Sequence, residues 1–232
     1  LEALVISGFS ALIALLAMFF AMLQTEKKSF GSIALFSLSS AILLLSESQA
    51  SQLLWNVPLM WDYLAAGSYY MLPVAMALLL EQWFSDRRPW LINLVWEIHL
   101  DYAVASITLA LSGLVDLSST YPLFDALLLV SLATITIVVV ERFRHLKIEQ
   151  QIILAAYAVF CTLLVVDMAV AHGVLPWRRV PVSWGTLIFS LAVVMISLWH
   201  YARTQQALHR LNLSLEQQVT ERTQKAEALA RR

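Results

Sequence analysis

The sequence predicts an all-α membrane protein: a bundle of seven transmembrane helices, N-terminus outside and C-terminus inside, followed by a parallel coiled coil. Three observations lead to this fold class. Of the 232 residues, 60% are hydrophobic and only 13% are charged, whereas a soluble domain carries about 25% charged residues. Several apolar segments are each long enough to cross a bilayer. One long polar stretch, from residue 203 to residue 232, follows the last of them.

The membrane helices are predicted from hydropathy and length. A spanning helix needs about 20 mostly apolar residues, and the segments that qualify are 1–24, 30–54, 61–84, 90–115, 122–141, 151–172 and 183–201. Pro73 lies inside the third segment and predicts a kink, whereas the other prolines lie in or at the edge of predicted connections. We therefore divide the sequence into a membrane domain, 1–202, and a cytoplasmic helix, 203–232.

The positions of Lys and Arg predict the orientation. Every second connection is basic, with Lys27, Lys28, Arg87, Arg88, Arg142, Arg144, Lys147 and Arg203. Basic connections face the cytoplasm, although Arg178 and Arg179 depart from this pattern. Tryptophans mark both interfaces, with Trp55, Trp61, Trp177 and Trp184 at the outer ends and Trp83, Trp90 and Trp199 at the inner ends. Because the sequence begins with Leu1 and has no basic flank before its first apolar run, we expect a piece of a longer protein and no signal peptide.

The fourth segment carries a polar stripe at membrane depth. Its members follow one another at spacings of four or seven residues and so share one helix face: Asn93, Glu97, Asp101, Thr108 and Ser112. Ionisable groups in a membrane usually face the bundle interior, so we expect this stripe inside. Either these groups hold neighbouring helices together by hydrogen bonds, or they sense a proton or a ligand. His99 lies about 200° around the helix from either carboxylate, so this segment alone predicts no metal site.

A second polar group lies near the predicted outer ends of the helices. It combines acidic, basic and aromatic side chains: Glu47, Trp55, Trp61, Asp62, Asp125, Asp167, His172, Trp177, Arg178 and Arg179, with Tyr69 at similar depth. Aromatic walls with a few polar anchors are typical of ligand pockets. The alternative is a set of helix ends wetted by solvent. If Glu47 and Asp167 line a cavity, poor solvation raises their pKa values and makes the site responsive to pH.

The polar C-terminal stretch has heptad character. Leu208, Leu215 and Leu229 take d positions, and Asn212 and Val219 take a positions. Leu at d with one Asn at a favours a parallel dimer and fixes its register. Arg222 also takes a d position and does not fit this pattern. The alternative to a dimeric coiled coil is a solvated helix without a partner.

Several chemistries are not predicted. The four lysines all lie outside the spans, so no retinal Schiff base is expected. Cys161 is the single cysteine, which excludes a disulfide or a cysteine-based metal site within one chain. No phosphate loop, HExxH motif or nucleophile elbow occurs. The sequence therefore predicts no cofactor and no catalytic site.

The terminal stretch "LNLSLEQQVTERTQKAEAL" resembles the signalling-helix linker that joins bacterial membrane sensors to histidine kinase or GGDEF diguanylate cyclase domains. The matching residues are Leu211, Asn212, Leu215, Glu216, Val219, Glu221, Arg222 and Thr223, whereas Lys225 stands where an apolar residue is usual. The seven preceding segments are similar in layout to bacterial seven-transmembrane receptors with diverse intracellular signalling modules. The resemblance implies a sensor in the bacterial inner membrane, coupled to an output domain beyond Arg232.

The expected function is therefore reception of a stimulus by the bundle and its transmission through a dimeric helix. The expected partners are the lipid bilayer, a second copy of the chain, and an unidentified small-molecule or physical stimulus, with no nucleic acid. Two other functions stay open. A transporter or channel would use Glu47, Glu97, Asp101 and Asp167 as a proton or ion path, and a structural anchor would only hold a catalytic dimer at the membrane.

Overall fold

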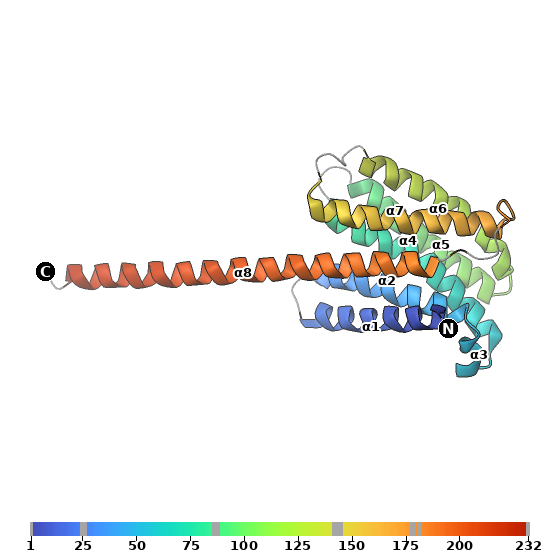
Figure 1. The fold of residues 1–232 in the computed structure, drawn as a ribbon, viewed down its shortest axis with the longest axis horizontal. Coiled ribbons are helices and arrows are strands. Elements are labelled where there is room, and N and C mark those ends of the chain that lie inside the picture. Colours follow the sequence, from blue (N-terminus) through green and yellow to red (C-terminus); the bar gives the residue numbers. More distant parts are fainter. Residues whose placement is uncertain are drawn as a thin grey trace. The chain divides into compact units, whose positions relative to one another are not determined.

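The computed structural model describes residues 2–23, 27–84, 89–140, 146–176, 180 and 182–230, with the backbone alone for 83, 84, 89, 138–140 and 221–230. The described residues form helices and short connections, with no strand among them (Figure 1). The helices are α1 (Glu2–Leu23), α2 (Lys27–Ser46), α3 (Ala50–Leu54), α4 (Pro58–Phe84), α5 (Pro89–Leu111), α6 (Leu117–Val140), α7 (Ile148–Ala171) and α8 (Val182–Ala230).

Seven of these helices are long and apolar enough to cross a membrane. The prediction of a multi-pass, all-helical membrane protein is therefore confirmed. The chain forms two compact units, Leu1–Val193 and Val194–Arg232, and their boundary lies within α8. The first unit contains the bundle, and the second consists of the later part of α8.

The second predicted span is shorter than expected, because α2 ends at Ser46 and a separate short helix, α3, follows. At this break, serine hydroxyls donate hydrogen bonds to backbone carbonyls that would otherwise accept from helical N–H groups. Ser46 Oγ donates to the carbonyl of Ile42 at 2.7 Å, and Ser48 Oγ donates to that of Leu45 at 2.7 Å. The break places Glu47 in a turn at the end of α2 rather than inside a continuous helix.

The end of α5 and the start of α6 differ from the predicted bounds of these helices. α6 begins at Leu117, so Pro122 lies inside this helix and not at its start. Gly113 and Gly173 close α5 and α7 with φ values of 74° and 72°. Only glycine adopts this left-handed conformation readily, and it is the usual residue just beyond a helix C-terminus. The two glycines therefore end α5 and α7, although apolar residues follow each glycine directly.

Two aromatic clusters hold the first unit together. Phe36 of α2, Phe160 of α7 and Phe189 of α8 pack with ring centroids 4.9 to 6.0 Å apart. α8 also approaches α7 closely at Gly185, where an added Cβ would lie 2.8 Å from Leu163 Cδ1 and 3.3 Å from Phe160 Cα. The second cluster joins α4, α5 and α6 around Phe124, which is fully buried.

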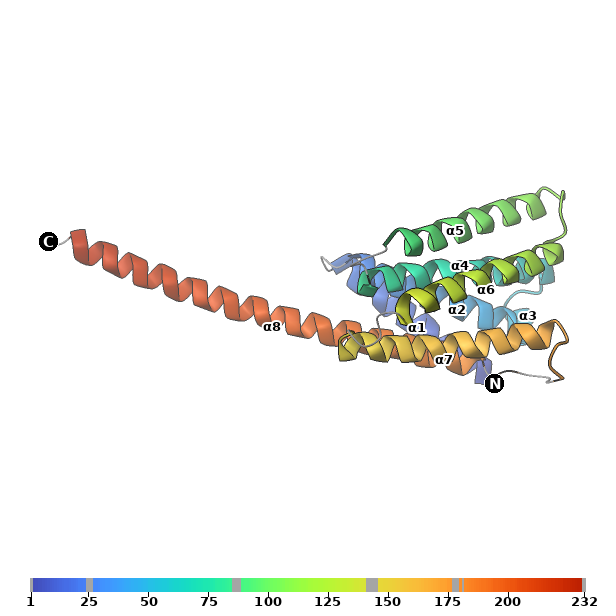
Figure 2. The same ribbon diagram turned by 90° about the horizontal axis from the view of Figure 1, so that it is seen from above.

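Helix α5 lies at an edge of the first unit, beside α4 (Figure 2). Its buried residues recur at intervals of three and four and form one face: Ile92, Val95, His99, Ala103, Ser106 and Ala110. This face packs mainly on α4 and also touches α6. The opposite side of α5, which includes Glu97, Asp101, Val104 and Thr108, is exposed among the residues that the structure describes.

Candidate functional site

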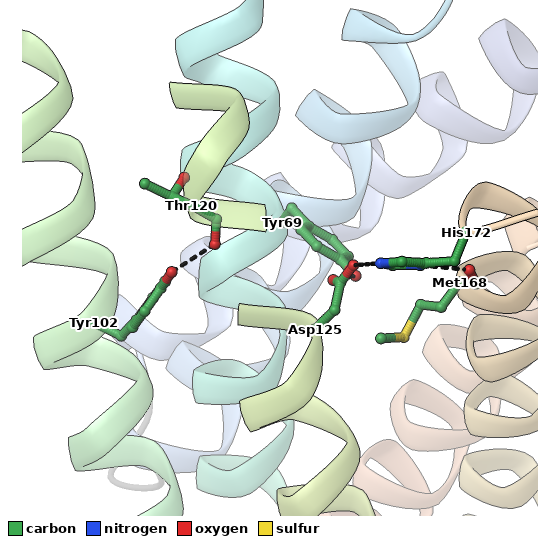
Figure 3. A network of polar contacts seen from close by, with 6 residues as sticks. All are labelled: Tyr69, Tyr102, Thr120, Asp125, Met168 and His172. Carbon is green, nitrogen blue, oxygen red and sulfur yellow. Dashed lines mark hydrogen bonds and ion pairs between the residues drawn. The ribbon is translucent and has the colours of Figure 1, made fainter. Parts of the chain in front are cut away.

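Tyr69, Asp125 and His172 form a polar network between three helices (Figure 3). The Tyr69 hydroxyl of α4 donates to Asp125 Oδ1 of α6 at 2.8 Å. Asp125 Oδ2 lies 3.7 Å from Nε2 of His172, which follows the last residue of α7. The Asp125 side chain is 13% exposed and the His172 side chain 48% exposed. The network is therefore shielded at Asp125 and accessible at His172.

The contact between His172 and Asp125 is an ion pair only when His172 is protonated. Nδ1 of His172 lies 2.8 Å from the carbonyl oxygen of Met168 (Figure 3), and since a carbonyl only accepts, Nδ1 carries a hydrogen. This bond leaves Nε2 on the side of Asp125. The attraction between α6 and the end of α7 at this contact therefore depends on the charge of His172.

Tyrosines fix the surroundings of this network. Tyr70 and Tyr102 both bond to Thr120 in the first turn of α6. Tyr70 bonds to the threonine Oγ1 at 2.5 Å, and Tyr102 bonds to the threonine carbonyl at 2.5 Å (Figure 3). Since Thr120 Oγ1 donates to the carbonyl of Leu117 at 2.6 Å, it accepts the Tyr70 hydrogen. The ring of Phe124 packs 4.9 Å from that of Tyr69. These contacts hold α4, α5 and α6 as a rigid support for Asp125.

The four carboxylates predicted for the outer pocket gather around two tyrosines. Asp125 and Asp167 act electrostatically on the Tyr69 hydroxyl. Asp62, Glu47 and Asp125 act in the same way on the hydroxyl of Tyr121. These acids come from α4, α6, α7 and the turn after α2. The structure thus brings Glu47, Asp62, Asp125, Asp167 and His172 to one region, the acidic end of the bundle.

Glu47 has a perturbed acidity. Its side chain is exposed in part, yet the surrounding protein limits its hydration and, together with the nearby negative charge of Asp167, raises its pKa above the ordinary value near 4.5. A raised pKa favours the neutral, proton-donating form of the carboxyl group. Glu47 therefore gains a proton at a higher pH than a fully hydrated glutamate does.

Two tryptophans of the predicted pocket pack against each other near the start of α4. The rings of Trp55 and Trp61 lie 6.2 Å apart, and the Trp61 indole N–H donates to the carbonyl of Trp55 at 2.9 Å. Trp61 is 7% exposed and Trp55 is 62% exposed. Trp61 therefore anchors the connection before α4, while Trp55 presents a free aromatic face. The remaining predicted pocket residues lie outside the described residues: Trp177, Arg178 and Arg179.

The polar stripe of α5 lies on the outside of the single chain, contrary to the prediction. Four of its members are exposed, namely Glu97, Asp101, Thr108 and Ser112, and Asn93 is partly buried. The reason is that α5 has polar residues on two faces, and its small and apolar face, which includes the fully buried His99, packs inward. His99 Nδ1 bonds to the carbonyl of Val95 at 2.8 Å and its ring packs on Phe124. In the described part of the chain, no three His, Cys, Asp or Glu side chains are placed to hold a metal ion.

The C-terminal part of α8 exposes the residues predicted to pair. Leu208 is 49% exposed, Leu215 is 48% exposed and Val219 is 64% exposed, and Asn212 is exposed as well. The side chain of Leu229 lies outside the described residues. A stripe of exposed leucine and valine on a helix otherwise polar is typical of a helix that pairs with a partner.

Sequence reasoning missed Tyr70, Tyr102, Thr120 and Tyr121. The signal was weak, because these are tyrosines and a threonine scattered through apolar runs, and their convergence depends on how three helices are rotated. No protein-family model, no curated protein and no solved structure matches the chain. Its function is therefore inferred from the geometry above and from the linker residues of α8.

Proposed function

We propose that this chain is the membrane sensor module of a bacterial signalling protein, set in the inner membrane with its C-terminus in the cytoplasm and active as a homodimer. α8 carries this proposal, because one helix of 49 residues begins as a membrane span and continues through the sequence that resembles a signalling-helix linker. A stimulus that alters the packing of the first part of α8 would be passed along this helix to a histidine kinase or diguanylate cyclase domain.

The input site of this proposal is the acidic end of the bundle. The Tyr69–Asp125–His172 network joins α4, α6 and the end of α7 through the Tyr69–Asp125 hydrogen bond and the Asp125–His172 contact, which is an ion pair when His172 is protonated. A proton, or a cationic or hydrogen-bonding ligand bound near the exposed ring of Trp55, changes how strongly α7 is held. Since α7 packs closely against α8 at Gly185, a shift of α7 would displace α8.

The Asp125–His172 contact supplies only part of the energy that a complete switch needs. Converting a two-state equilibrium from 1:99 to 99:1 takes about 5.5 kcal/mol of differential affinity. His172 is half-exposed, and an ion pair exposed to solvent contributes about 0.2–1 kcal/mol. Two such pairs, one in each subunit of a dimer, supply about 0.4–2 kcal/mol. The proposal therefore requires that both subunits respond together and that the contacts of the stimulus itself supply the larger part of the difference.

A transporter is less well supported by the arrangement of the carboxylates. Glu47 and Asp167 lie at the acidic end, whereas Glu97 and Asp101 lie on the outer face of α5. These four groups do not line one path through a single bundle. Reconstitution in liposomes discriminates the two functions, because proton or solute flux without a stimulus supports transport and its absence supports reception.

The receptor proposal is tested by the output of the full-length protein in native membranes. Asp125→Asn and His172→Gln each remove the proton-dependent contact, and we expect either change to alter kinase or cyclase activity several-fold and to abolish its response to the stimulus. Asp116→Asn is the matched control, because Asp116 lies in the exposed α5–α6 connection. Equal output from all three variants and the wild type would support a structural anchor instead.

A further inference from the structure

A cavity of the first unit lies away from the acidic end. It lies between the first turns of α2, the last turns of α4 and the first turns of α5, and its volume is about 880 Å³. Its wall has apolar and polar parts, and the polar part includes Lys27, Lys28, Glu81, Gln82, Asn93 and Trp96. Cavities of about 300–1,000 Å³ with a few convergent polar groups are typical of small-molecule sites.

Three of the lining side chains have a buried polar atom without a hydrogen-bond partner in the described part of the chain. These atoms are Gln82 Oε1, Asn93 Oδ1 and Trp96 Nε1. Buried polar atoms in native proteins are nearly always paired. An occupant of the cavity that carries both donors and acceptors would satisfy all three after small side-chain rotations.

The orientation of Gln82 is fixed by its neighbour. Ser32 Oγ donates to the carbonyl of Lys28 at 2.9 Å, so this oxygen can only accept from Gln82, whose Nε2 lies 3.1 Å away. Gln82 therefore presents a carbonyl oxygen as its unpaired atom. Together with the Glu81 carboxylate, the wall offers acceptors for hydroxyl groups, and the Trp96 indole offers a donor.

The other side of the cavity is basic. Lys27 and Lys28 are exposed at the start of α2, and neither forms an ion pair with the residues that the structure describes. Helix α2 also directs its unpaired N–H groups and its positive dipole end toward this point. Two ammonium groups beside a helix N-terminus favour a phosphate group. Since the wall also holds one carboxylate, a ligand with several negative charges and no hydroxyl groups fits less well.

We propose that this cavity binds a phosphate ester that carries free hydroxyl groups, with the phosphate at Lys27 and Lys28 and the hydroxyls at Glu81, Gln82 and Asn93. The glycerol phosphate head group of an anionic phospholipid has this chemistry, and so does a soluble polyol phosphate. The site lies in the half of the bundle opposite the Tyr69–Asp125–His172 network and does not depend on the proposed receptor function.

Binding is tested with the purified full chain in micelles, by native mass spectrometry and by the thermal unfolding temperature. The ligands are phosphatidylglycerol, phosphatidylcholine, which has a phosphate but no free hydroxyl, and glycerol 3-phosphate. We expect phosphatidylglycerol to bind and stabilise more than phosphatidylcholine. Competition by millimolar glycerol 3-phosphate would identify a soluble ligand, whereas retention of the lipid alone would identify the head group.

The variants separate the cavity from general charge effects. The double variant Lys27→Gln/Lys28→Gln should weaken phosphatidylglycerol binding roughly 10- to 30-fold, at about one tenfold step or less for each lysine. Lys147→Gln/Lys225→Gln removes the same charge elsewhere and should change binding less than about twofold. Asn93→Leu should keep the fold, remove one unpaired atom and abolish the preference for phosphatidylglycerol over phosphatidylcholine. Equal binding of both lipids to the wild type, or equal losses in the two double variants, would overturn the proposal.

Discussion

Replacing Tyr69 by Phe removes one hydroxyl group and leaves the ring that packs 4.9 Å from Phe124 in place. The lost hydrogen bond to Asp125 is 2.8 Å long and lies between α4 and α6. Hydrogen bonds between membrane helices contribute about 0.6 kcal/mol on average and about 1.7 kcal/mol at most, and bonds to charged groups about 1.5–3 kcal/mol. Because Asp125 is shielded, we expect about 1.5 kcal/mol, close to a tenfold change in the folding equilibrium.

The assay is reversible unfolding of the purified chain in mixed micelles with Tyr69→Phe, Asp125→Asn and the double variant. The double-mutant cycle should give a coupling free energy of about 1 kcal/mol or more. Tyr63→Phe is the control, because this tyrosine of α4 has no hydrogen bond with the described residues. A coupling below about 0.3 kcal/mol, the usual limit of additivity, would refute the network as a stabilising link.

Three further predictions concern charge and packing. Because the pKa of Glu47 is raised, the folded chain binds this proton more tightly than the unfolded chain, and Glu47 lowers the free energy of unfolding as pH rises. Glu47→Gln should therefore raise the free energy of unfolding at high pH. In unfolding measured as a function of pH, the difference between this variant and the wild type should disappear below about pH 4. Asp101→Leu should leave the free energy of unfolding unchanged or raise it, because it removes a carboxylate from the exposed surface of a membrane helix, whereas Ala103→Leu, on the buried face of α5, should lower it by about 1–3 kcal/mol; the reverse order would contradict the assignment of the buried face of α5. Gly185→Ala should destabilise by about 1–3 kcal/mol because its Cβ meets Phe160 Cα at 3.3 Å, whereas Gly8→Ala, with open space around it, should stabilise slightly; a similar result for both would contradict close packing of α7 on α8.

Hydropathy and length predicted the number and order of the membrane helices, because a bilayer imposes a minimum apolar length on each crossing. The break after Ser46 was not predicted, because the second span was continued through the polar stretch SESQASQ to residue 54. It depends on side-chain to backbone hydrogen bonds of three serines at one point, and such bonds have no hydropathy signature. The end of α5, which is followed by Gly113, was predicted at residue 115 instead of Leu111, whereas the end of α7 at Ala171 was predicted to within one residue.

The side of α5 that faces the bundle was predicted incorrectly, because the cost of charge in lipid and the pattern of small residues favoured different sides. The cost of a carboxylate in lipid favoured Glu97 and Asp101 inside, whereas the periodicity of Ala103 and other small residues matches the surface of α4. Packing determined the outcome in the single chain. At the acidic end, composition selected Asp125 and His172 among other residues, but the contact between them and the bond from Tyr69 to Asp125 depend on the relative rotation of α4, α6 and α7.

The central claim, that the acidic end controls a dimeric α8, is tested most directly by disulfide cross-linking in native membranes. Leu208→Cys and Leu215→Cys are introduced one at a time into a Cys161→Ala background, which removes the single natural cysteine. We expect both positions to form cross-linked dimers, and we expect Asp125→Asn to change the ratio of their cross-linking rates. If the α8 helices never cross-link, or if the ratio of the two cross-linking rates is the same with and without Asp125, the proposed control of a dimeric α8 is contradicted.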